Sequence, residues 1–465
     1  MKTLADPGNA LADGLAAIRQ EFQVPAGFPP EVLVAAEAAA KRAPTAHVDR
    51  TALPFITLDP ATSTDLDQAL YIEASGADLL LHYAIADVAW FVSDGDLIDA
   101  EAWRRGETLY LPDGKAGLYP PVLAEGAASL LPSGPRPAVI FIVRVRPDGS
   151  VVLDGAERGI IRSRAKLAYD LVTPADLPPG FGELASRIQA AEAERGASRV
   201  DPPEQQLERH ADGSFELVFR PHLASEVSNA AMSLATNLAV ADLLQAHRTG
   251  LFRVMARPEK PAVKRLRITA RALGIDWPNG VDLDAFERRL DQHIPADAAL
   301  MLAIRRAGPG ASYAPYREGV VPWHSAMAAT YAHATAPLRR LADRYVVQAA
   351  LATANGRPVP EPVSAAFERL PAVMARADAL AGRIDRSVLD LAEAVLLSGR
   401  EGETFKAVVT EVVDRWAKVQ LCDLPVRARV SAGKAEPGDQ LQLRLTEVDP
   451  ARRSIAFEQV RGSAS

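Results

Sequence analysis

Cysteine is almost missing from this chain of 465 residues, which contains only Cys422. A single cysteine excludes an intramolecular disulfide and any metal site built from cysteine ligands. The residues after Met1 also lack the apolar core of a signal peptide, and we expect no apolar run to be long enough to span a bilayer. We therefore expect a soluble, cytoplasmic protein that works without a membrane.

An excess of positive charge is missing as well. The chain has 52 lysine and arginine residues against 59 aspartate and glutamate residues, a formal net charge of −7. This balance argues against a protein that coats nucleic acid through its overall charge. The balance does not exclude a protein that binds nucleic acid inside a channel, because a channel needs positive side chains only along its lining.

The pattern of apolar residues predicts an α+β chain in three parts, as its length suggests. Residues 1–50 have helical spacing and predict a small helical segment. Residues 51–400 begin with strands and become mainly helical, which indicates one mixed domain. Residues 401–465 follow a glycine-rich boundary and contain five short alternating strands, which predict a small closed barrel of the OB-fold type.

Individual elements of the middle part can also be predicted. Residues 79–88 form a nearly continuous apolar run, typical of a strand that is buried on both faces. Residues 147–149 read Pro-Asp-Gly and predict a hairpin turn between two strands. Helices are predicted at 186–196, 223–248, 261–273, 283–306, 325–356 and 364–397.

The most informative stretch, residues 55–69, begins as a strand and breaks at Asp59, which precedes a proline. Small hydroxylated residues follow, and then Asp65 and Asp67, which share one face if the chain there is extended. Carboxylates gathered this closely repel one another unless a cation lies between them, and hard oxygen ligands suit Mg²⁺ or Mn²⁺ rather than zinc. Taken alone, however, the stretch is more typical of an acidic surface loop with an Asx-turn.

A second stretch contains a pair of arginines. Thr335 and the proline two residues later predict the start of a helix, so Arg339 and Arg340 would lie where the helix macrodipole disfavours cations. A bound phosphate would explain them, because the helix amides and both guanidinium groups would then face an anion. The alternative is that Arg340 or Arg344 simply pairs with Asp343 or another carboxylate nearby.

A third stretch carries Tyr110 in a short strand that ends at a proline. Such a ring can stack on a nucleobase. Standing alone, a tyrosine in a strand is more often part of the core.

Together, these stretches resemble one family, the ribonuclease II / ribonuclease R (RNB) exoribonucleases, over residues 28–460 and in the family's order. The blocks that carry the resemblance are 28–33, Asp59 with Asp65 and Asp67, 85–88, 105–112 with 129–130, 161–169, 335–343 and the S1-type barrel from Gly402 with Gly438-Asp439 and Val448-Asp449.

The resemblance implies a hydrolytic 3′→5′ exoribonuclease with an RNB catalytic domain and an S1-type RNA-binding barrel. Single-stranded RNA, bound at its 3′ end without sequence preference, would be degraded to nucleoside 5′-monophosphates by a two-metal mechanism with Mg²⁺ or Mn²⁺. We expect the protein to be a monomer.

The resemblance also assigns residues to roles. Asp59, Asp65, Asp67 and Gln68 would be the metal ligands. Asp67, Arg339 and Arg340 would be catalytic. The substrate would be bound by Tyr110, Thr335, Phe405 and Trp416, although Trp416 fits the core of a barrel equally well.

The chain departs from the family pattern at several positions. Gln68 stands where a fourth Asp is usual, Ala84 where a His is usual and Gly382 where a Glu is common, and the paired Glu residues near 230–237 are absent. Only about fifty residues precede the catalytic part, too few for the family's usual two N-terminal cold-shock barrels. We therefore expect a wider entrance for RNA into the catalytic site, which would accept structured RNA with a 3′ overhang.

Two alternatives remain open on the sequence alone. The first is a catalytically decayed RNA-binding scaffold on the same fold, which Gln68 and the missing Glu residues would explain. The second is a metal-dependent nuclease that acts on DNA or on dinucleotides.

Overall fold

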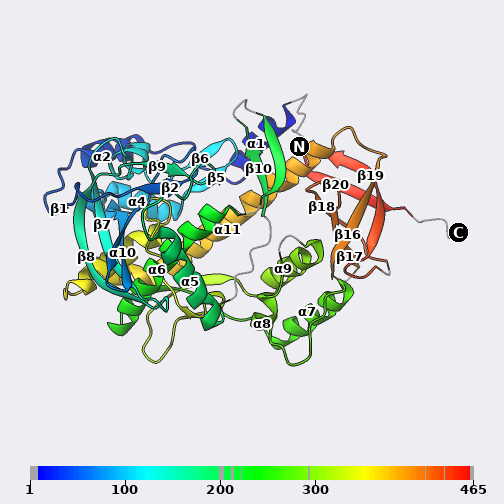
Figure 1. Cartoon of the computed structure of the whole chain (residues 1–465). Helices are drawn as coiled ribbons and strands as arrows, with labels where there is room; N and C mark the ends of the chain where they lie inside the picture. The colour runs from blue at the N-terminus through cyan, green and yellow to red at the C-terminus, as the bar shows by residue number, and fades with distance from the viewer. Residues whose placement is uncertain are drawn as a thin grey trace.

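The computed structural model describes residues 9–197, 204–210, 214–220, 222–291, 294–413, 415–433 and 435–460. They form a larger body of mixed helices and strands and a smaller β-barrel at the C-terminal end (Figure 1). The α+β organisation and the terminal barrel predicted from the sequence are therefore confirmed.

The body is built around a five-stranded sheet in the order β1-β8-β7-β4-β3. Its strands are β1 (Val48–Asp49), β3 (Gln68–Ser75), β4 (Asp78–Ala86), β7 (Arg136–Val145) and β8 (Val151–Ile161). Neighbouring strands are antiparallel except for the parallel pair β1 and β8. The continuous apolar run lies in β4, where Leu81, Tyr83 and Ile85 are fully buried, as expected for a strand with no solvent face.

Helices of the second half of the chain cover this sheet. They are α5 (Phe181–Arg195), α6 (Ala224–Ala246) and α10 (Leu341–Ala354), which pack against β7 and β8. Within the described residues, α6 is the one helix whose length and composition would suit a membrane span, so the sequence-based expectation of no such run is wrong. In the structure, 67% of its most apolar window is buried, as in the core helix of a globular body.

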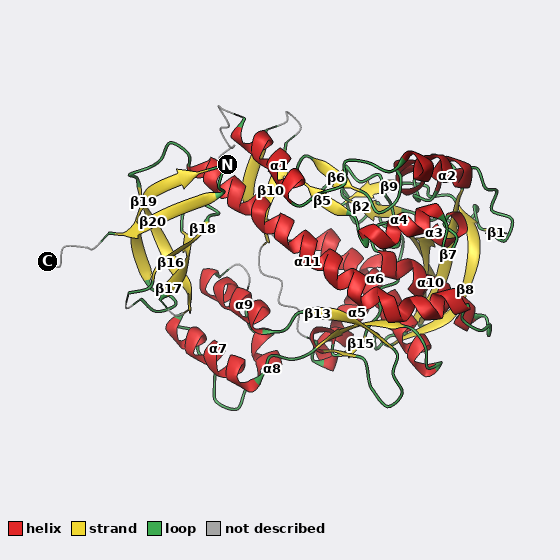
Figure 2. Ribbon diagram, turned by 180° about the vertical axis from the view of Figure 1, so that it is seen from behind, coloured by secondary structure: helices red, strands yellow, loops and turns green. Residues whose placement is uncertain are grey.

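The remaining helices are α7 (Lys260–Ala272), α8 (Leu283–Glu287), α9 (Pro295–Ala307) and the long α11 (Glu361–Leu397). The predicted helix at 283–306 is thus two helices, and Pro295 begins the second because proline is favoured in the first turn. The predicted helix at 325–356 begins only at Leu341. Figure 2 shows α11 running from the body to the barrel, so this helix joins the two parts.

The first half of the chain also contains short elements near the aspartates. They are β2 (Thr57–Asp59), which pairs with β9 (Lys166–Ala168), the hairpin of β5 (Leu109–Leu111) and β6 (Gly114–Ala116), α3 (Val88–Phe91), α4 (Leu97–Arg105) and η1 (Leu123–Ala127).

Among the later helices lie short strands that the sequence did not predict. They are the hairpin β10 (Glu204–Arg209) and β11 (Phe215–Arg220), and the sheet of β13 (Ala311–Pro315), β12 (Leu251–Met255), β14 (Trp323–His324) and β15 (Ala329–Thr330), with η2 (Ser325–Met327) between the last two strands.

Two N-terminal helices, α1 (Ala10–Glu21) and α2 (Pro30–Ala40), form the predicted helical segment within the described residues. Leu11, Leu15 and Ile18 of α1 pack against α11. Gly14 permits this close approach, because a Cβ added there would come within 2.5 Å of Leu391.

The C-terminal barrel has the five strands that the sequence predicted. They are β16 (Thr404–Val413), β17 (Trp416–Leu421), β18 (Arg427–Ser431), β19 (Gln440–Asp449) and β20 (Ser454–Gln459). All neighbouring pairs are antiparallel in the order β18-β17-β16-β19-β20, and the edge strands β18 and β20 approach each other, so the barrel is nearly closed.

Candidate active site

Asp59 ends strand β2 and carries a carboxylate that the protein does not satisfy. Its Oδ2 atom is buried without a hydrogen-bond partner among the described residues. Burial raises the pKa of Asp59 to about 7, although Arg339 and Lys166 oppose the shift. Because burial without a partner disfavours the charged form, this carboxylate is a place where an added cation would be stabilising.

Asp67 lies in the loop before β3 and faces the loop that carries the arginines. Its Oδ1 atom accepts a hydrogen bond from the Leu338 amide at 2.7 Å, and Arg339 Nε lies 3.5 Å from Oδ2. Burial nevertheless raises the pKa of Asp67 to about 8. The positive charge around this carboxylate is therefore too weak to compensate for its loss of water.

Asp65, in the same loop, differs from the other two aspartates because both of its oxygens have partners. Tyr110 donates a hydrogen bond from its hydroxyl to Oδ2 at 3.1 Å, and Lys115 Nζ lies 2.9 Å from Oδ1. Lys115 also pairs with Glu125 at 3.0 Å. The loop before β3 forms no strand, and Asp65 and Asp67 face different partners.

Gln68 begins β3 and points toward helix α6. Its Oε1 atom accepts hydrogen bonds from the Tyr83 hydroxyl at 2.7 Å and from the Ser233 hydroxyl at 3.2 Å. Two donors fill both lone pairs of a carbonyl oxygen. The structure therefore does not present Gln68 as the fourth metal ligand that the family pattern implied.

The aspartates fit a divalent cation by their chemistry. Among the described residues, no three His, Cys, Asp or Glu side chains gather closely enough to hold a metal ion. Asp59 and Asp67 nevertheless offer hard carboxylate oxygens, one unpartnered and both with raised pKa values, and a Mg²⁺ or Mn²⁺ ion would compensate them.

The two arginines of the pair have different surroundings. The side chain of Arg339 is 47% exposed, and among the described residues it pairs with Asp67 alone, in a long contact of 3.5 Å. Arg340 is half-buried and binds Asp343 through two hydrogen bonds of 2.9 and 2.7 Å. This pairing was the alternative for Arg340, and it occupies two of the three guanidinium nitrogens. The structure therefore favours Arg339 as the phosphate ligand, and a catalytic role of Arg340 stays a prediction.

The segment before these arginines is a loop rather than a helix start. Thr335 is buried, and its hydroxyl accepts a hydrogen bond from Asn237 at 3.5 Å. Asp343 accepts from the Ala336 amide at 2.8 Å and so ties the loop to the first turn of α10. Tertiary hydrogen bonds thus fix this loop and leave Arg339 exposed. Thr335 is buried but lines a cavity beside Arg339, and its contact with substrate stays a prediction.

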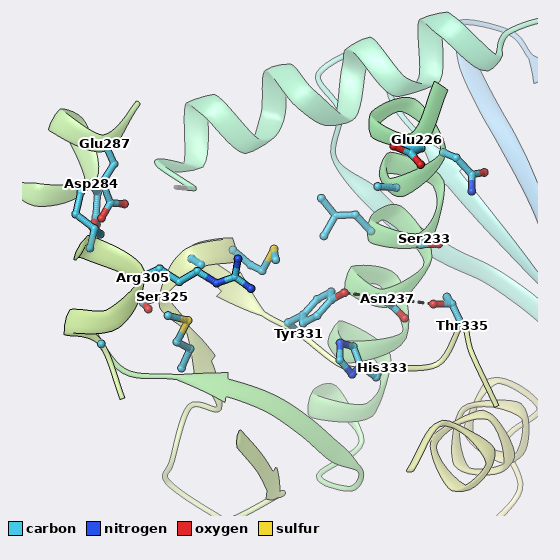
Figure 3. Close-up of a pocket in the computed structure, with 18 of the residues that line it drawn as sticks. Glu226, Ser233, Asn237, Asp284, Glu287, Arg305, Ser325, Tyr331, His333 and Thr335 are labelled. Atoms are coloured by element: carbon cyan, nitrogen blue, oxygen red, sulfur yellow. Dashed lines mark hydrogen bonds between the residues drawn. The ribbon is translucent and has the colours of Figure 1, made fainter. Parts of the chain in front are cut away.

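A line of cavities passes this site. Figure 3 shows the first, of about 560 Å³, between α6, α8 and the segment with Tyr331 and His333. It shares His333 and Arg339 with a second cavity of about 350 Å³, which contains Tyr110. Tyr110 also lines a third cavity of about 630 Å³ that reaches Arg427 of the barrel. A channel therefore leads from the barrel past Tyr110 to Arg339.

The three aromatic residues proposed to bind substrate have different positions. Tyr110 is 51% exposed in β5, so its ring is available for stacking. Trp416 is 45% exposed at the start of β17 and is therefore not core filler. Phe405 is buried and packs edge-to-face on Phe457, so the structure assigns its ring to the barrel core and lends no support to the predicted contact with substrate.

Sequence reasoning missed several residues that surround the aspartates. Lys115 is the most important, because it lies opposite Tyr110 in the β5–β6 hairpin and touches Asp65. The Pro112-Asp113-Gly114 sequence is a turn signal that could have revealed this pairing. Asn229 is another, since it donates hydrogen bonds to the Leu58 carbonyl and the Tyr169 hydroxyl beside Asp59.

Comparisons with known proteins agree with the fold. A family model described as the RNB domain matches residues 47–354, and one described as the RNase II-type exonuclease C-terminal S1 domain matches residues 403–460. Ribonuclease R of Aquifex aeolicus (strain VF5) is 24% identical over 493 residues, which cover 95% of this chain and 69% of that protein. Ribonuclease R of Escherichia coli (strain K12) is 25% identical over 419 residues, which cover 83% of this chain and 51% of that protein.

A solved structure is similar over nearly the whole chain. The structure of Mycoplasma genitalium RNase R in complex with ribose methylated single-stranded RNA superposes with a TM-score of 0.86 at 20% sequence identity. The match covers 99% of this chain and 79% of that one.

The chain belongs to the RNB domain family, because the RNB model matches well over half of it. The resemblance seen in the sequence is thereby confirmed, together with the S1-type barrel at the C-terminal end. The chain spans about half of the length of the Escherichia coli relative.

Proposed function

We propose that this protein is a metal-dependent 3′→5′ exoribonuclease that releases nucleoside 5′-monophosphates from single-stranded RNA. The observation that carries the proposal is the group of uncompensated carboxylates, Asp59 and Asp67, next to the exposed Arg339 in a channel. Membership of the RNB family and relatives named ribonuclease R support the RNA substrate and the direction.

The side chains along the channel suit a sequence-independent RNA substrate. Tyr110 offers an aromatic face for the 3′-terminal base, and stacking does not read base edges. Arg339 is placed to bind the scissile phosphate and to stabilise the charge that develops on it. At the far end, Arg427 of the barrel lines the third cavity, and the exposed Trp416 elsewhere on the barrel would offer a second stacking platform for the strand.

The aspartates complete the proposed chemistry. Asp59 and Asp67 would hold Mg²⁺ or Mn²⁺, with Asp65 beside them. The bound ion supplies hydroxide at neutral pH and offsets the negative charge of the phosphodiester. The 2′-hydroxyl gives the site a feature with which to distinguish RNA from DNA.

The alternative of a decayed RNA-binding scaffold is not favoured. Gln68 and the missing Glu residues motivate it, and Gln68 is indeed held away from the aspartates. A scaffold, however, gains nothing from two buried carboxylates whose pKa values are raised to about 7 and about 8. Their retention beside Arg339 is easier to explain by chemistry.

One assay distinguishes these functions. Purified protein is incubated with 5′-labelled oligo(A) and with Mg²⁺ or Mn²⁺, next to a matched deoxy-oligonucleotide and an Asp67→Asn variant. We expect a series of shortening products that ends at a short limit product on RNA only. Intact RNA with both metals would favour the scaffold, and equal digestion of the deoxy-oligonucleotide would favour a DNA nuclease.

Structured RNA with a 3′ overhang is the second substrate that we propose. The body and barrel leave a channel of cavities between β10, α9 and α11 that reaches the surface near Arg427. A hairpin RNA with a 3′ single-stranded tail tests this proposal. Degradation into the stem supports it, and a stall several nucleotides before the stem contradicts it.

We also propose that the protein is a cytoplasmic monomer. The negative net charge supports this proposal. Size-exclusion chromatography with light scattering and fractionation of cells test it, since a dimeric mass or recovery in the membrane fraction would contradict it.

A further inference from the structure

Lys115 is the charged residue near the aspartates that the proposed chemistry does not yet use. It lies in β6, opposite Tyr110, in the hairpin that approaches the acidic loop, by which we mean the segment from Asp59 to Asp67. Its ammonium group lies 2.9 Å from Asp65 and 3.0 Å from Glu125. Lys115 and Tyr110 thus occupy the two oxygens of Asp65 from the two strands of one hairpin.

The hairpin holds Lys115 in this position. Arg19 of helix α1 binds Asp113 in the hairpin turn with two hydrogen bonds of 2.8 Å and also donates to the Gly114 carbonyl. Leu109 and Leu111 of β5 and Ala116 of β6 are buried, so both strands of the hairpin are anchored. Lys115 is therefore a fixed cation, unlike a lysine on a free surface.

The three aspartates divide into two kinds on this basis. Asp65 has a cationic partner in direct contact. The Oδ2 atom of Asp59 is unpartnered, and the nearest guanidinium nitrogen to Asp67 lies 3.5 Å away. A cation from solution would thus gain most at Asp59 and Asp67 and least at Asp65.

A count of formal charges supports one divalent ion instead of two. The three aspartates and one bound phosphodiester together carry four negative charges, and Lys115, Arg339 and one divalent ion together carry four positive charges. Glu125 and Lys166 at the edges of the group cancel each other. A second divalent ion would leave an excess of +2 in a partly buried place, which is unfavourable.

We infer that Lys115 takes the place of a second divalent cation at Asp65, so that this site holds one divalent ion, at Asp59 and Asp67. The inference rests on the proposed function for the phosphodiester but concerns the ion content of the free protein. It replaces the two-metal mechanism implied by the family resemblance with a mechanism of one metal and one lysine. Lys115 acts here by positioning charge next to Asp65.

The test measures ion binding without RNA. Isothermal titration calorimetry and electron paramagnetic resonance count the Mn²⁺ ions that bind to the full chain at pH 7.5. We expect one Mn²⁺ per chain in the native protein. We expect Lys115→Met to bind a second Mn²⁺, or to bind the first at least about tenfold more tightly, since Asp65 becomes available.

Three further variants make the result specific. Lys115→Gln also removes the charge but keeps a polar side chain that can donate a hydrogen bond. It should bind Mn²⁺ as Lys115→Met does, and it provides the test if the methionine variant does not fold. Lys115→Arg keeps the charge and should bind one Mn²⁺. Lys264→Met, on the exposed face of α7, is the matched control and should match the native protein. Thermal unfolding verifies that each variant is folded.

Two outcomes would overturn the inference. The first is a native protein that binds two Mn²⁺ ions of similar affinity. The second is a folded Lys115→Met or Lys115→Gln variant whose ion number is unchanged and whose affinity changes by less than about twofold. Failure of the proposed function has a different signature, because a protein that binds one Mn²⁺ but leaves RNA intact would refute the exoribonuclease and leave the role of Lys115 standing.

Discussion

In the C-terminal barrel, charged side chains pair with one another at the surface, as Lys418 does with Glu411 at 2.5 Å and Arg444 with Glu458 at 3.2 Å. In the acidic loop of the body, Asp59 and Asp67 are buried and their charges are not matched. These barrel charges are matched by partners, as folding alone would favour. The acidic loop instead holds charge at a cost to stability.

The difference distinguishes charged residues that stabilise the fold from charged residues that serve the proposed reaction. Where charge is matched, its removal should affect stability, and where charge is unmatched, its removal should affect activity. Arg340 and Arg339 show the same contrast at neighbouring positions, because Arg340 is fully paired with Asp343 and Arg339 is half exposed. Each prediction below tests one side of this contrast.

The largest effect is expected for Asp67→Asn. Loss of this carboxylate should lower the rate of RNA hydrolysis by about 10³-fold, because it removes a ligand and a charge at the reacting phosphate. The free energy of unfolding should stay the same or rise, since burial of the carboxylate is unfavourable. Initial rates on oligo(A) and thermal melts measure both quantities, and a large loss of stability would contradict this view of Asp67.

The second-largest effects are expected for the two neighbouring arginines, which can be compared directly. Arg339→Lys should lower activity by about 10²-fold with little change in stability, because lysine cannot bind a phosphate with two parallel hydrogen bonds. Arg340→Met should instead cost about 3–5 kcal/mol of unfolding free energy, since it leaves Asp343 buried without its partner. Denaturant titrations measure the stability of each variant, and initial rates on oligo(A) measure its activity. Equal effects of the two variants on both quantities would contradict the distinction between Arg339 and Arg340.

Two aromatic residues of the barrel should differ in the same way. Phe405→Ala should destabilise the barrel by about 3–5 kcal/mol because it opens a cavity in the core. Trp416→Ala should leave stability nearly unchanged and weaken RNA binding by between about fivefold and 10²-fold, the range for loss of one stacked base. Fluorescence anisotropy with labelled RNA and the unfolding of each variant provide the measurements. Unchanged RNA affinity in Trp416→Ala would remove this residue from the interface.

The smallest effect concerns the joint between body and barrel. Glu393 of α11 accepts hydrogen bonds from Gln205 at 2.6 Å and from the Arg427 amide at 2.7 Å, and burial raises its pKa from 4.5 to about 7. Between pH 4.5 and pH 7, the Glu393 carboxyl stays protonated in the folded state but loses its proton in the unfolded chain. The free energy of unfolding should therefore fall as pH rises from 4.5 to 7, by at most about 3 kcal/mol.

Glu393→Gln removes this titration and preserves an acceptor for both hydrogen bonds. We expect the variant to be more stable than the native protein at pH 8 and to show a weaker dependence on pH between 4.5 and 7. Urea titrations across this range give the comparison. An identical pH profile in the two proteins would show that Glu393 is charged in the folded state.

Much of the fold and part of the site could be predicted from the sequence. The five short strands of the barrel and the continuous run in β4 follow local alternation and burial, so they were recognisable. Asp59, Asp67 and Arg339 could be assigned from their order in the family pattern. The alternation along β16 could also have shown that Phe405 is buried, since Phe405 lies on the same face of this strand as the buried Ala407 and Val409.

The parts that could not be predicted depend on contacts between distant residues. Gln68 is held by Tyr83 and by Ser233, which lies 165 positions further along the chain. The loop before α10 is fixed by Asp67 and Asn237, and these contacts override the local signal for a helix start. The place of Lys115 beside Asp65 likewise depends on how two loops meet.

The central claim is that unmatched charge beside Arg339 marks a site that removes nucleotides from the 3′ end of RNA. The most direct measurement follows two copies of one RNA, labelled at the 5′ end or at the 3′ end, over the first few turnovers. We predict that the 3′ label appears at once in a nucleoside 5′-monophosphate, whereas the 5′ label remains on progressively shorter RNA. Release of the 5′ label first, cleavage into internal fragments, or intact RNA would contradict the account.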